Sequence, residues 1–478
     1  MQGALPISLP KTTSPTRPSP ERRQGHDRAH LKMDKNDQES AIGEWIRREL
    51  GAEVTSMVRQ PRWRPAWFIE ARRPDEDLHL YVRGERLDAR IGFSLAHEMK
   101  LQSLLSERDI PVARVHGWIE SPRAYVMDRL EGADHLNDLA SADRDAVLTS
   151  YIETLARIHA LDVEPFAEAG IIRAERPTDS GRIGMEVYEK AYRANKRQPD
   201  PFLEFTLSWL RRNPLPPDDR ESVVLWDTGQ FIQDEGRLRA LIDLEIGHIG
   251  DPMMDLAGFR MRAREIGFNN FEQLYALYEE ATQKPVDRIA IQHHYFSFAL
   301  CNQLAFHAAL AEPPAGSDYM MNLRWCVETN LYAIEALAEI LGLQLEPIPA
   351  PAAKASRTAP AQDHLIAWLR TIEVRDPAQS HQARSAFRLA RHLARESQIG
   401  ASIEADDLDD LGHLLGRRPS DWMEGDRNLE SFILTANEQR DEELVQLFHR
   451  RLSRQLLSLG PEGSAMAQHH PVSGIARS

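Results

Sequence analysis

The chain has 478 residues, of which 42% are hydrophobic and 27% charged, and its formal net charge is −15. At roughly 100–200 residues per domain this length indicates two or three units. The negative charge argues against nucleic-acid or anionic-membrane partners, which require a positive field. The two cysteines, Cys301 and Cys326, are too few for a disulfide framework or a cysteine-based zinc site, so we expect a cytoplasmic protein.

The first residues are rich in proline, serine and arginine and lack the apolar stretch of a secretory signal. We interpret residues 1–38 as a disordered tail, or as an upstream extension of a chain that begins at Met33. No run of about 18 apolar residues occurs in the sequence, which argues against a membrane-spanning helix.

Residues 39–132 predict a small β-rich lobe that contains one main helix. Apolar periodicity indicates a helix over 41–50 and a second over 94–108. Alternating runs indicate strands that begin near residues 67, 78, 113 and 123. In the second of these runs, alternation places Leu80 and Val82 on one face and Arg83 on the other.

The rest of the chain reads mainly as helices. Residues 133–344 predict a helical lobe with one β-hairpin embedded in it, and residues 345–361 form a Pro/Ala-rich linker. Residues 362–460 predict an all-helical segment without a catalytic constellation, which we interpret as an interaction or homo-oligomerisation module. We expect residues 461–478 to be a disordered tail.

The segment 223–255 carries the strongest chemical signal. Two short apolar runs each end in an acidic residue, Asp227 and Asp243, with a turn at Asp234-Glu235-Gly236 between them. Apolar strands around such a turn predict a hairpin, with Asp227 and Gln230 at its entry and Asp243 past its exit. Two carboxylates and an amide at one sheet edge can position a hydroxyl and hold a divalent metal, as phosphoryl transfer requires.

The small lobe, this hairpin and the following GDPMMDLA resemble the aminoglycoside phosphotransferase and choline kinase-like family over roughly residues 42–341. The resemblance implies an α+β, protein-kinase-like two-lobe fold, followed here by the helical segment. It also implies transfer of phosphate from ATP, with Mg²⁺, to the hydroxyl of a small molecule. Asp227 would then be the catalytic base, and Gln230 and Asp243 the metal ligands.

This sequence departs from the family's His-Gly-Asp motif. Leu225 and Trp226 stand where the family has histidine and glycine, and the spacer between Asp227 and the amide of Gln230 is shorter by two residues. A longer amide side chain on a shorter loop can reach the same point, which we take as the working hypothesis.

The resemblance also assigns nucleotide-binding positions in the small lobe. Arg83 stands where the family has its phosphate-binding lysine, and Glu98 on the next helix is its expected ion-pair partner. Met127 and Arg129 belong to the run that resembles the hinge beside adenine.

No glycine-rich phosphate loop precedes these positions. The corresponding stretch contains Arg62 and Arg64, which we interpret as surface charges rather than phosphate ligands. Past the hairpin, we interpret Asp251 and Asp255 as carboxylates that brace a loop or cap a helix.

A cluster of three histidines offers a metal site as another interpretation. We expect His293, His294 and His307 to be ordinary helical residues, because adjacent histidines on a helix diverge by about 100°. Cys301 and Cys326 lie in apolar segments that are predicted to be helical, and we expect them to be core residues.

Two other functions compete with a kinase. Asp227-Thr228-Gly229 matches the aspartic-protease signature, but that enzyme needs a second copy of the motif and a β-rich body. A nucleotide-binding pseudokinase with a regulatory or scaffolding role is the stronger alternative, because the catalytic motif is atypical. The acceptor stays open among aminoglycosides, choline-like alcohols, sugars, hydroxyacyl compounds and homoserine.

Overall fold

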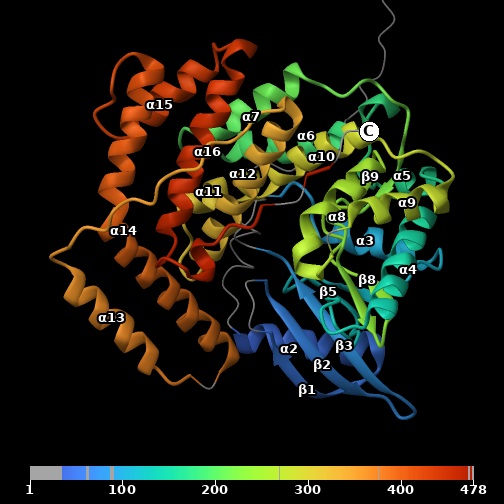
Figure 1. The fold of residues 1–478 in the computed structure, drawn as a ribbon. Helices are drawn as coiled ribbons and strands as arrows, with labels where there is room; N and C mark the ends of the chain where they lie inside the picture. Colours follow the sequence, from blue (N-terminus) through green and yellow to red (C-terminus); the bar gives the residue numbers. More distant parts are fainter. Residues whose placement is uncertain are drawn as a thin grey trace, which may run out of the picture.

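The computed structural model describes residues 35–60, 64–86, 91–268, 270–374, 376–471 and 474–475. It has a β-rich lobe, a mainly helical lobe and a C-terminal helical segment that lies beside the second lobe (Figure 1). The predicted tail 1–38 lies almost entirely outside the described residues.

The first lobe is a five-stranded antiparallel sheet in the order β1-β2-β3-β5-β4. Its strands are β1 (Glu53–Arg59), β2 (Ala66–Arg72), β3 (Asp77–Gly84), β4 (Val115–Ile119) and β5 (Ala124–Asp128). Its helices are α2 (Lys35–Trp45), the π-helical turn η1 (Ile46–Leu50) and α3 (Leu95–Ser106).

The two faces of β3 have different environments, as alternation predicts. Leu80 and Val82 are buried in a cluster with Ile42 and Ile46 of the N-terminal helical turns. Arg83 points to the other face. It is also buried, because Glu98 on α3 forms an ion pair with it there.

The second lobe contains most of the helices and two small sheets. Its helical elements are α4 (Ser141–His159), α5 (Glu164–Glu168), η2 (Pro177–Asp179), α6 (Ser180–Asn195), α7 (Pro201–Arg212), α8 (Met253–Ile266), α9 (Phe271–Thr282), α10 (Arg288–Ala299), α11 (Cys301–Ala311) and α12 (Tyr319–Leu341). Its strands are β6 (Ser222–Val224), β7 (Phe231–Asp234), β8 (Arg237–Leu241) and β9 (His248–Gly250).

The predicted hairpin is confirmed for β7 and β8 but not for the first apolar run. Glu235 and Gly236 form the turn with φ of 47° and 74°, the left-handed pair that two-residue hairpins favour. Residues 222–224, expected to belong to the hairpin, instead form β6 and pair with β9.

Backbone hydrogen bonds join the β7–β8 hairpin to the segments that border the first lobe. Gln233 and Ala133 exchange two bonds of 2.8 Å each, and the amide of Leu241 donates to the carbonyl of Pro111 at 2.8 Å. Gly132 makes the first contact feasible, since a Cβ on this residue would lie 2.3 Å from the carbonyl oxygen of Gln233.

The C-terminal segment shares its core with the second lobe. Its elements are α13 (Ala359–Thr371), α14 (Pro377–Leu415), α15 (Trp422–Ile433), η3 (Glu438–Arg440), α16 (Asp441–Ser458) and η4 (Ala465–Ala467). The apolar face of α16 is buried, and Phe448 stacks on Phe205 of α7 with ring centroids 5.5 Å apart.

The end of the chain differs from the expected disordered tail. The side chain of His469 is hydrogen bonded to Glu335 at 2.6 Å, and the carbonyl of Gln468 accepts from Arg324 at 2.9 Å. Ile475 is buried. Gln468, His469 and Ile475 therefore lie against α12 rather than projecting from the fold.

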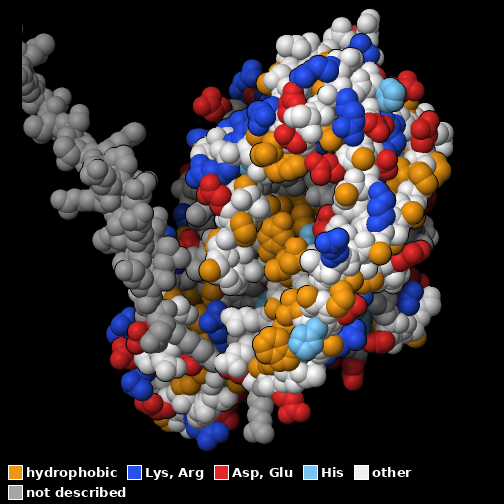
Figure 2. All heavy atoms as spheres, turned by 90° about the vertical axis from the view of Figure 1, so that its left-hand side faces the viewer, with side chains coloured by type: hydrophobic (Ala, Val, Ile, Leu, Met, Phe, Trp, Pro, Cys, Tyr) orange, Lys and Arg blue, Asp and Glu red, His pale blue; other side chains and the backbone are white. Residues whose placement is uncertain are grey.

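Part of the C-terminal segment exposes apolar side chains. Figure 2 faces the side on which α13, α14 and α15 lie in Figure 1, and shows apolar groups gathered in its middle with charged groups around them. Leu365 and Trp368 of α13 and Leu393 of α14 are among the exposed large apolar residues. Among the described helices, none combines the length and apolarity that a membrane span needs.

Candidate active site

One cavity of about 320 Å³ brings together the three residues to which the sequence assigns the chemistry. Asp227, Gln230 and Asp243 all line it, beside residues of the loop after β3, of α8 and of α10 to α12. Asp227 and Gln230 lie on the loop between β6 and β7, and Asp243 follows β8. The fold therefore places them around one space although they come from three backbone positions.

The backbone before Asp227 keeps a shape that usually belongs to glycine. Trp226 has a φ of 62°, in the left-handed region that costs a non-glycine residue about 1–3 kcal/mol. The buried indole packs against Tyr188 and His248, with ring centroids 5.8 and 5.3 Å away. The packing of a large ring thus offsets the strain at the position where the family has glycine.

Asp255 holds this loop by hydrogen bonds, as expected for a bracing carboxylate. Its Oδ1 accepts the backbone amides of Leu225 at 3.0 Å and Trp226 at 2.5 Å. Its Oδ2 is bonded to Nε2 of His159 at 2.9 Å, and its backbone oxygen accepts from the hydroxyl of Thr228. The loop is fixed on both sides of Asp227.

Asp227 is held by a residue that the sequence analysis did not identify. Arg262 on α8 donates from Nε to Oδ1 at 2.9 Å and from Nη2 to Oδ2 at 2.6 Å, a bidentate pair. Burial raises the pKa of the Asp227 carboxyl and is only partly opposed by Arg262. The partner of Asp227 is a guanidinium rather than a second aspartate, which disagrees with the aspartic-protease interpretation.

Asp243 belongs to a buried network that links the two lobes. Nη2 of Arg83 donates to Asp243, and Nε of Arg83 lies 2.9 Å from Oε1 of Glu98. The expected ion pair between Arg83 and Glu98 is therefore present. Arg64 lies 3.4 Å from Glu98 and also contacts Glu245, so that three carboxylates surround two guanidinium groups.

The network sets the charge states of its members. Burial alone would raise the pKa of Asp243, but Arg83 and Arg64 outweigh it and lower that pKa well below its usual range. Burial raises the pKa of Glu98 even though Arg83 opposes the shift. Burial would lower the pKa of Arg83, but the negative charges of Glu98 and Asp243 outweigh burial and raise this pKa above its usual value. Asp243 therefore stays ionised.

Oxygen ligands for a hard cation are available in this cavity. Gln230 donates its amide nitrogen to the carbonyl of Asp227 at 3.4 Å, and Asp243 carries a charged carboxylate. Within the described parts of the chain, no three or more His, Cys, Asp or Glu side chains are grouped to hold a metal ion. A Mg²⁺ ion commonly takes one or two carboxylates plus phosphate oxygens and water, so these two residues fit that role.

None of the four predicted nucleotide-binding residues lines this cavity: Arg83 and Glu98 contact it through Asp243, whereas Met127 and Arg129 have other partners. Met127 accepts a hydrogen bond from Gln102 at Sδ, 3.3 Å away. The guanidinium of Arg129 donates to Glu70 at 2.8 Å and lies over Phe68, 4.6 Å from its ring centroid. Neither residue lines the cavity around Asp227, so the hinge assignment stays a prediction.

Arg64 corrects one prediction. It was expected to be a surface charge, but it is buried, because the carboxylates of Glu98 and Glu245 neutralise it. Arg62 lies outside the described residues.

The three histidines weighed as a metal site have other partners. Nε2 of His294 lies 3.2 Å from Asp251, and Nδ1 of His307 lies 3.1 Å from Asp200. Nε2 of His293 is bonded to the carbonyl of Asn213 at 2.9 Å. Asp251 also accepts the amide of Met253 at the start of α8, the structural role expected of it.

The sequence analysis missed Arg262 and Glu245, although both leave a signal. Arg262 follows Asp255 by seven residues, which places both on the same face of α8. Glu245 follows Asp243 by two, the spacing that puts two side chains on one side of extended backbone.

A comparison with protein families matches residues 93–287 to the phosphotransferase enzyme family known as APH. Acyl-CoA dehydrogenase family member 11 of Rattus norvegicus is 28% identical over 174 residues, which are 34% of this chain and 22% of that protein. The human protein of the same name is 29% identical over 148 residues, 29% of this chain and 18% of that protein. The chain thus spans about a fifth of the length of these relatives.

Solved structures of similar architecture include two phosphotransferases. Macrolide 2'-phosphotransferase type I has a TM-score of 0.44 at 18% identity, covering 62% of this chain and 97% of its own. Choline kinase LicA from Streptococcus pneumoniae has a TM-score of 0.45 at 19% identity, covering 63% of this chain and 98% of its own.

Proposed function

We propose that this protein transfers the γ-phosphate of ATP to a hydroxyl group of a small molecule, since residues 93–287 match the phosphotransferase enzyme family. The observation that carries the proposal is the convergence of Asp227, Gln230 and Asp243 on one cavity, with the Arg83–Glu98 pair directly behind Asp243. Both cysteines are free and buried, which fits a reducing compartment, and the cytoplasm is the proposed location.

Asp227 would orient the acceptor hydroxyl and take its proton as the oxygen attacks the γ-phosphorus and the bond to ADP breaks. Its bidentate pair with Arg262 does not prevent this. A carboxylate offers about four lone-pair sites, and Arg262 occupies two of them. Arg262 instead fixes the orientation of the carboxylate.

The family's Mg²⁺ would be held by Gln230 and Asp243 and would neutralise phosphate charge. Arg83, steadied by Glu98, would contribute a permanent positive charge on the same side. The rigid brace from Asp255 keeps Asp227 at a fixed place relative to Gln230.

The charges that line the cavity narrow the class of acceptor. Each lining carboxylate already has an arginine partner: Asp227 has Arg262, Asp243 has Arg83, Glu245 has Arg64 and Arg86, and Glu328 has Arg324. A polycationic acceptor such as an aminoglycoside needs unpaired carboxylates. The cavity therefore favours an acceptor of low positive charge.

The far wall of the cavity is largely apolar and aromatic. Met261, Phe298, Phe306 and Trp325 line it together with Ala305. Such a wall would bury a hydrocarbon chain, with about 25 cal/mol gained per Å² of apolar surface removed from water. We propose a hydroxylated compound with a substantial apolar part. Acyl thioesters with a hydroxyl group are natural test compounds, since the relatives are named acyl-CoA dehydrogenases.

The test is ATP consumption by the purified chain with Mg²⁺ and a panel of acceptors. The panel contains hydroxyacyl compounds as acids and thioesters, choline, homoserine, sugars and an aminoglycoside. We expect turnover with the hydroxyacyl group and a loss of about 10²–10⁴-fold in Asp227→Asn. An Asp227→Asn variant as active as the wild type would contradict the role of Asp227.

The pseudokinase alternative makes a different prediction in the same experiment. Its motivation is the substitution of Leu225 and Trp226 for the family's histidine and glycine. It requires a thermal shift with ATP and Mg²⁺ but no turnover with any acceptor, in the wild type and in Asp227→Asn alike.

A further inference from the structure

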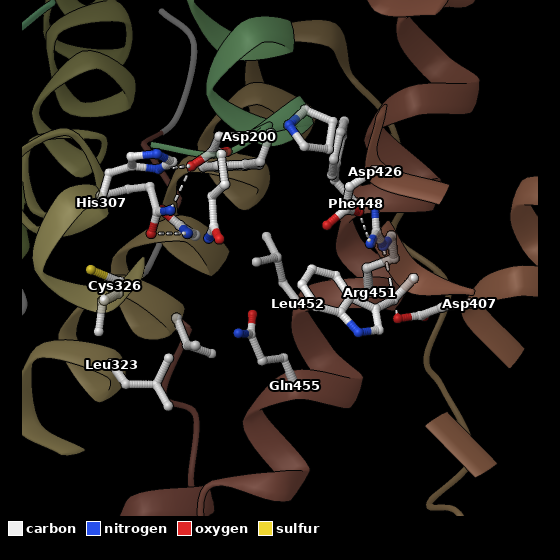
Figure 3. Close-up of a pocket in the computed structure, with 18 of the residues that line it drawn as sticks. Asp200, His307, Leu323, Cys326, Asp407, Asp426, Phe448, Arg451, Leu452 and Gln455 are labelled. Atoms are coloured by element: carbon white, nitrogen blue, oxygen red, sulfur yellow. Dashed lines mark hydrogen bonds and ion pairs between the residues drawn. The ribbon is translucent and has the colours of Figure 1, made fainter. Parts of the chain in front are cut away.

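A second cavity of about 400 Å³ lies between the helical lobe and the C-terminal segment. In Figure 3, Asp200 and His307 lie on one side of it and Asp407, Asp426 and Arg451 on the other. Helices α11 and α12 therefore separate two cavities, because other residues of the same helices line the space around Asp227.

The wall contributed by the helical lobe is fixed by hydrogen bonds. Asp200 is buried and accepts the amide of Leu203 at 3.0 Å as the N-cap of α7. It also accepts from Nε2 of Gln303 at 2.7 Å and is bonded to Nδ1 of His307 at 3.1 Å. Burial raises the pKa of Asp200, but the bonds from His307, Leu203 and Gln303 outweigh it and lower that pKa, so Asp200 is ionised.

The side-chain oxygen of Asn330, on the same wall, accepts no hydrogen bond from the described residues. Its side chain is 4% exposed, and its Nδ2 donates to Oε1 of Gln303 at 3.2 Å. Its Oδ1 is buried and has no hydrogen-bond partner in the described chain. An unsatisfied buried carbonyl costs about 1–3 kcal/mol, which a ligand with an N–H or O–H donor would recover.

The opposite wall adds a carboxylate without a cation. Glu396 of α14 lines the cavity, is half-buried, and forms no ion pair or hydrogen bond with any other described residue. Arg451, the guanidinium of this cavity, already pairs with Asp426 at 2.7 Å and with Asp407 at 3.8 Å. Asp407 also pairs with Arg454 at 2.7 Å, and Asp200 with His307 at 3.1 Å. Among the four carboxylates that line the cavity, Glu396 is therefore the one without an arginine or histidine partner in the described chain.

Apolar groups line the rest of the space. Phe202, Phe448, Leu323 and Leu452 belong to the wall, and Trp422 lies at the cavity with 52% of its surface exposed. A hydrocarbon chain would be buried against these groups, and an ammonium ion near an aromatic face gains a further attraction.

We propose that this cavity is a second small-molecule site that takes an organic ammonium ion with a hydrocarbon chain. The ammonium group donates hydrogen bonds to Oδ1 of Asn330 and balances the charge of Glu396. Arg451 does not recruit an anion here, because two carboxylates already neutralise it. The site is independent of phosphoryl transfer, since none of its residues lines the cavity around Asp227.

The test is isothermal titration of the full chain with cadaverine and with pentanediol, which has the same chain length but no charge. We expect saturable binding of cadaverine and affinity for pentanediol that is at least about tenfold weaker. Equal binding of the two compounds, or no saturable heat from cadaverine up to about 10 mM, would overturn the proposal.

Two matched variants locate the binding. Glu396→Gln removes the unpaired charge and is expected to weaken cadaverine binding about tenfold. Glu404→Gln changes an exposed glutamate of the same helix and is expected to leave the affinity unchanged. Loss of affinity in both variants, or in neither, would show that cadaverine binds elsewhere.

Asn330→Leu provides a further check on the acceptor oxygen. It is expected to weaken cadaverine binding more than pentanediol binding, because the ammonium is the better donor. Equal weakening of both compounds would assign Asn330 to the shape of the cavity and overturn its proposed contact.

Discussion

The cavities on the two sides of α11 and α12 differ in how their carboxylates are balanced. Around Asp227, each lining carboxylate has an arginine partner. Around Asp200, the carboxylate of Glu396 and the amide oxygen of Asn330 are left without partners among the described residues. The first cavity is therefore electrostatically complete before it binds anything, whereas the second lacks a positively charged donor.

This difference shows that the number of acidic residues around a cavity does not by itself identify a cation-binding site. The cavity around Asp227 is lined by four carboxylates, as many as the second cavity contains. What distinguishes the two is the supply of guanidinium groups from the first lobe and from α8. Four substitutions test the comparison.

Arg83→Leu should have the largest effect on stability. It leaves the buried carboxylate of Glu98 with Arg64 at 3.4 Å and removes the ion-pair partner of the half-buried Asp243. Removing one member of a buried charge network costs about 3–5 kcal/mol in the free energy of unfolding. Urea denaturation measures this, with Arg239→Leu at an exposed ion pair as the control. A cost below that of the control would mean that the network is not held by charge.

Arg262→Met should change the pH dependence of catalysis more than the stability. Burial raises the pKa of Asp227 and Arg262 lowers it, so removal of Arg262 raises this pKa further. A base must be deprotonated, and the acidic limb of the kcat/KM profile should therefore move to higher pH. A limb that stays in place, or moves to lower pH, would contradict the role of Asp227 as the base.

The carboxyl group of Asp227 also makes the free energy of unfolding depend on pH, in a direction that its pKa shift determines. Since the pKa of Asp227 is raised on folding, the folded state holds this proton more tightly than the unfolded state. The contribution of Asp227 to stability therefore falls as the pH rises from the unfolded pKa through the raised folded pKa. In Asp227→Asn this decrease should be absent.

Glu396→Gln should have the smallest effect on stability. Because Glu396 has no ion-pair partner among the described residues, its substitution removes no ion pair. We expect a change within about 0.5 kcal/mol in the free energy of unfolding. A destabilisation as large as that of Arg83→Leu would show that Glu396 is paired and that the contrast between the cavities is wrong.

Local patterns explain why some of this architecture was predictable. Alternation in residues 78–84 separated the core face of β3 from Arg83, and the helix that follows supplied Glu98. The turn at Glu235-Gly236 indicated the β7–β8 hairpin. By contrast, β1 was missed because it is an edge strand without a single buried residue, so its pattern carries little apolar signal.

Contacts between distant segments could not be predicted in the same way. The partner of Asp227 lies 35 residues further along the chain, on a helix whose own periodicity does not indicate it. The pairing of β6 with β9 spans the hairpin that lies between them. The second cavity depends on how α14 to α16 dock on α11 and α12, and no single segment encodes that docking.

The backbone bonds between Gln233 and Ala133 have a mechanical consequence. The hairpin that carries Gln230 and Asp243 at its ends is fastened to the chain between the lobes, so the lobes cannot separate by sliding the hairpin away from residue 133. An opening that keeps these bonds and the bond from Leu241 to Pro111 must rotate the lobes about the hairpin. The amide protons of Ala133 and Gln233 should accordingly exchange with solvent more slowly than those at the tip of the hairpin.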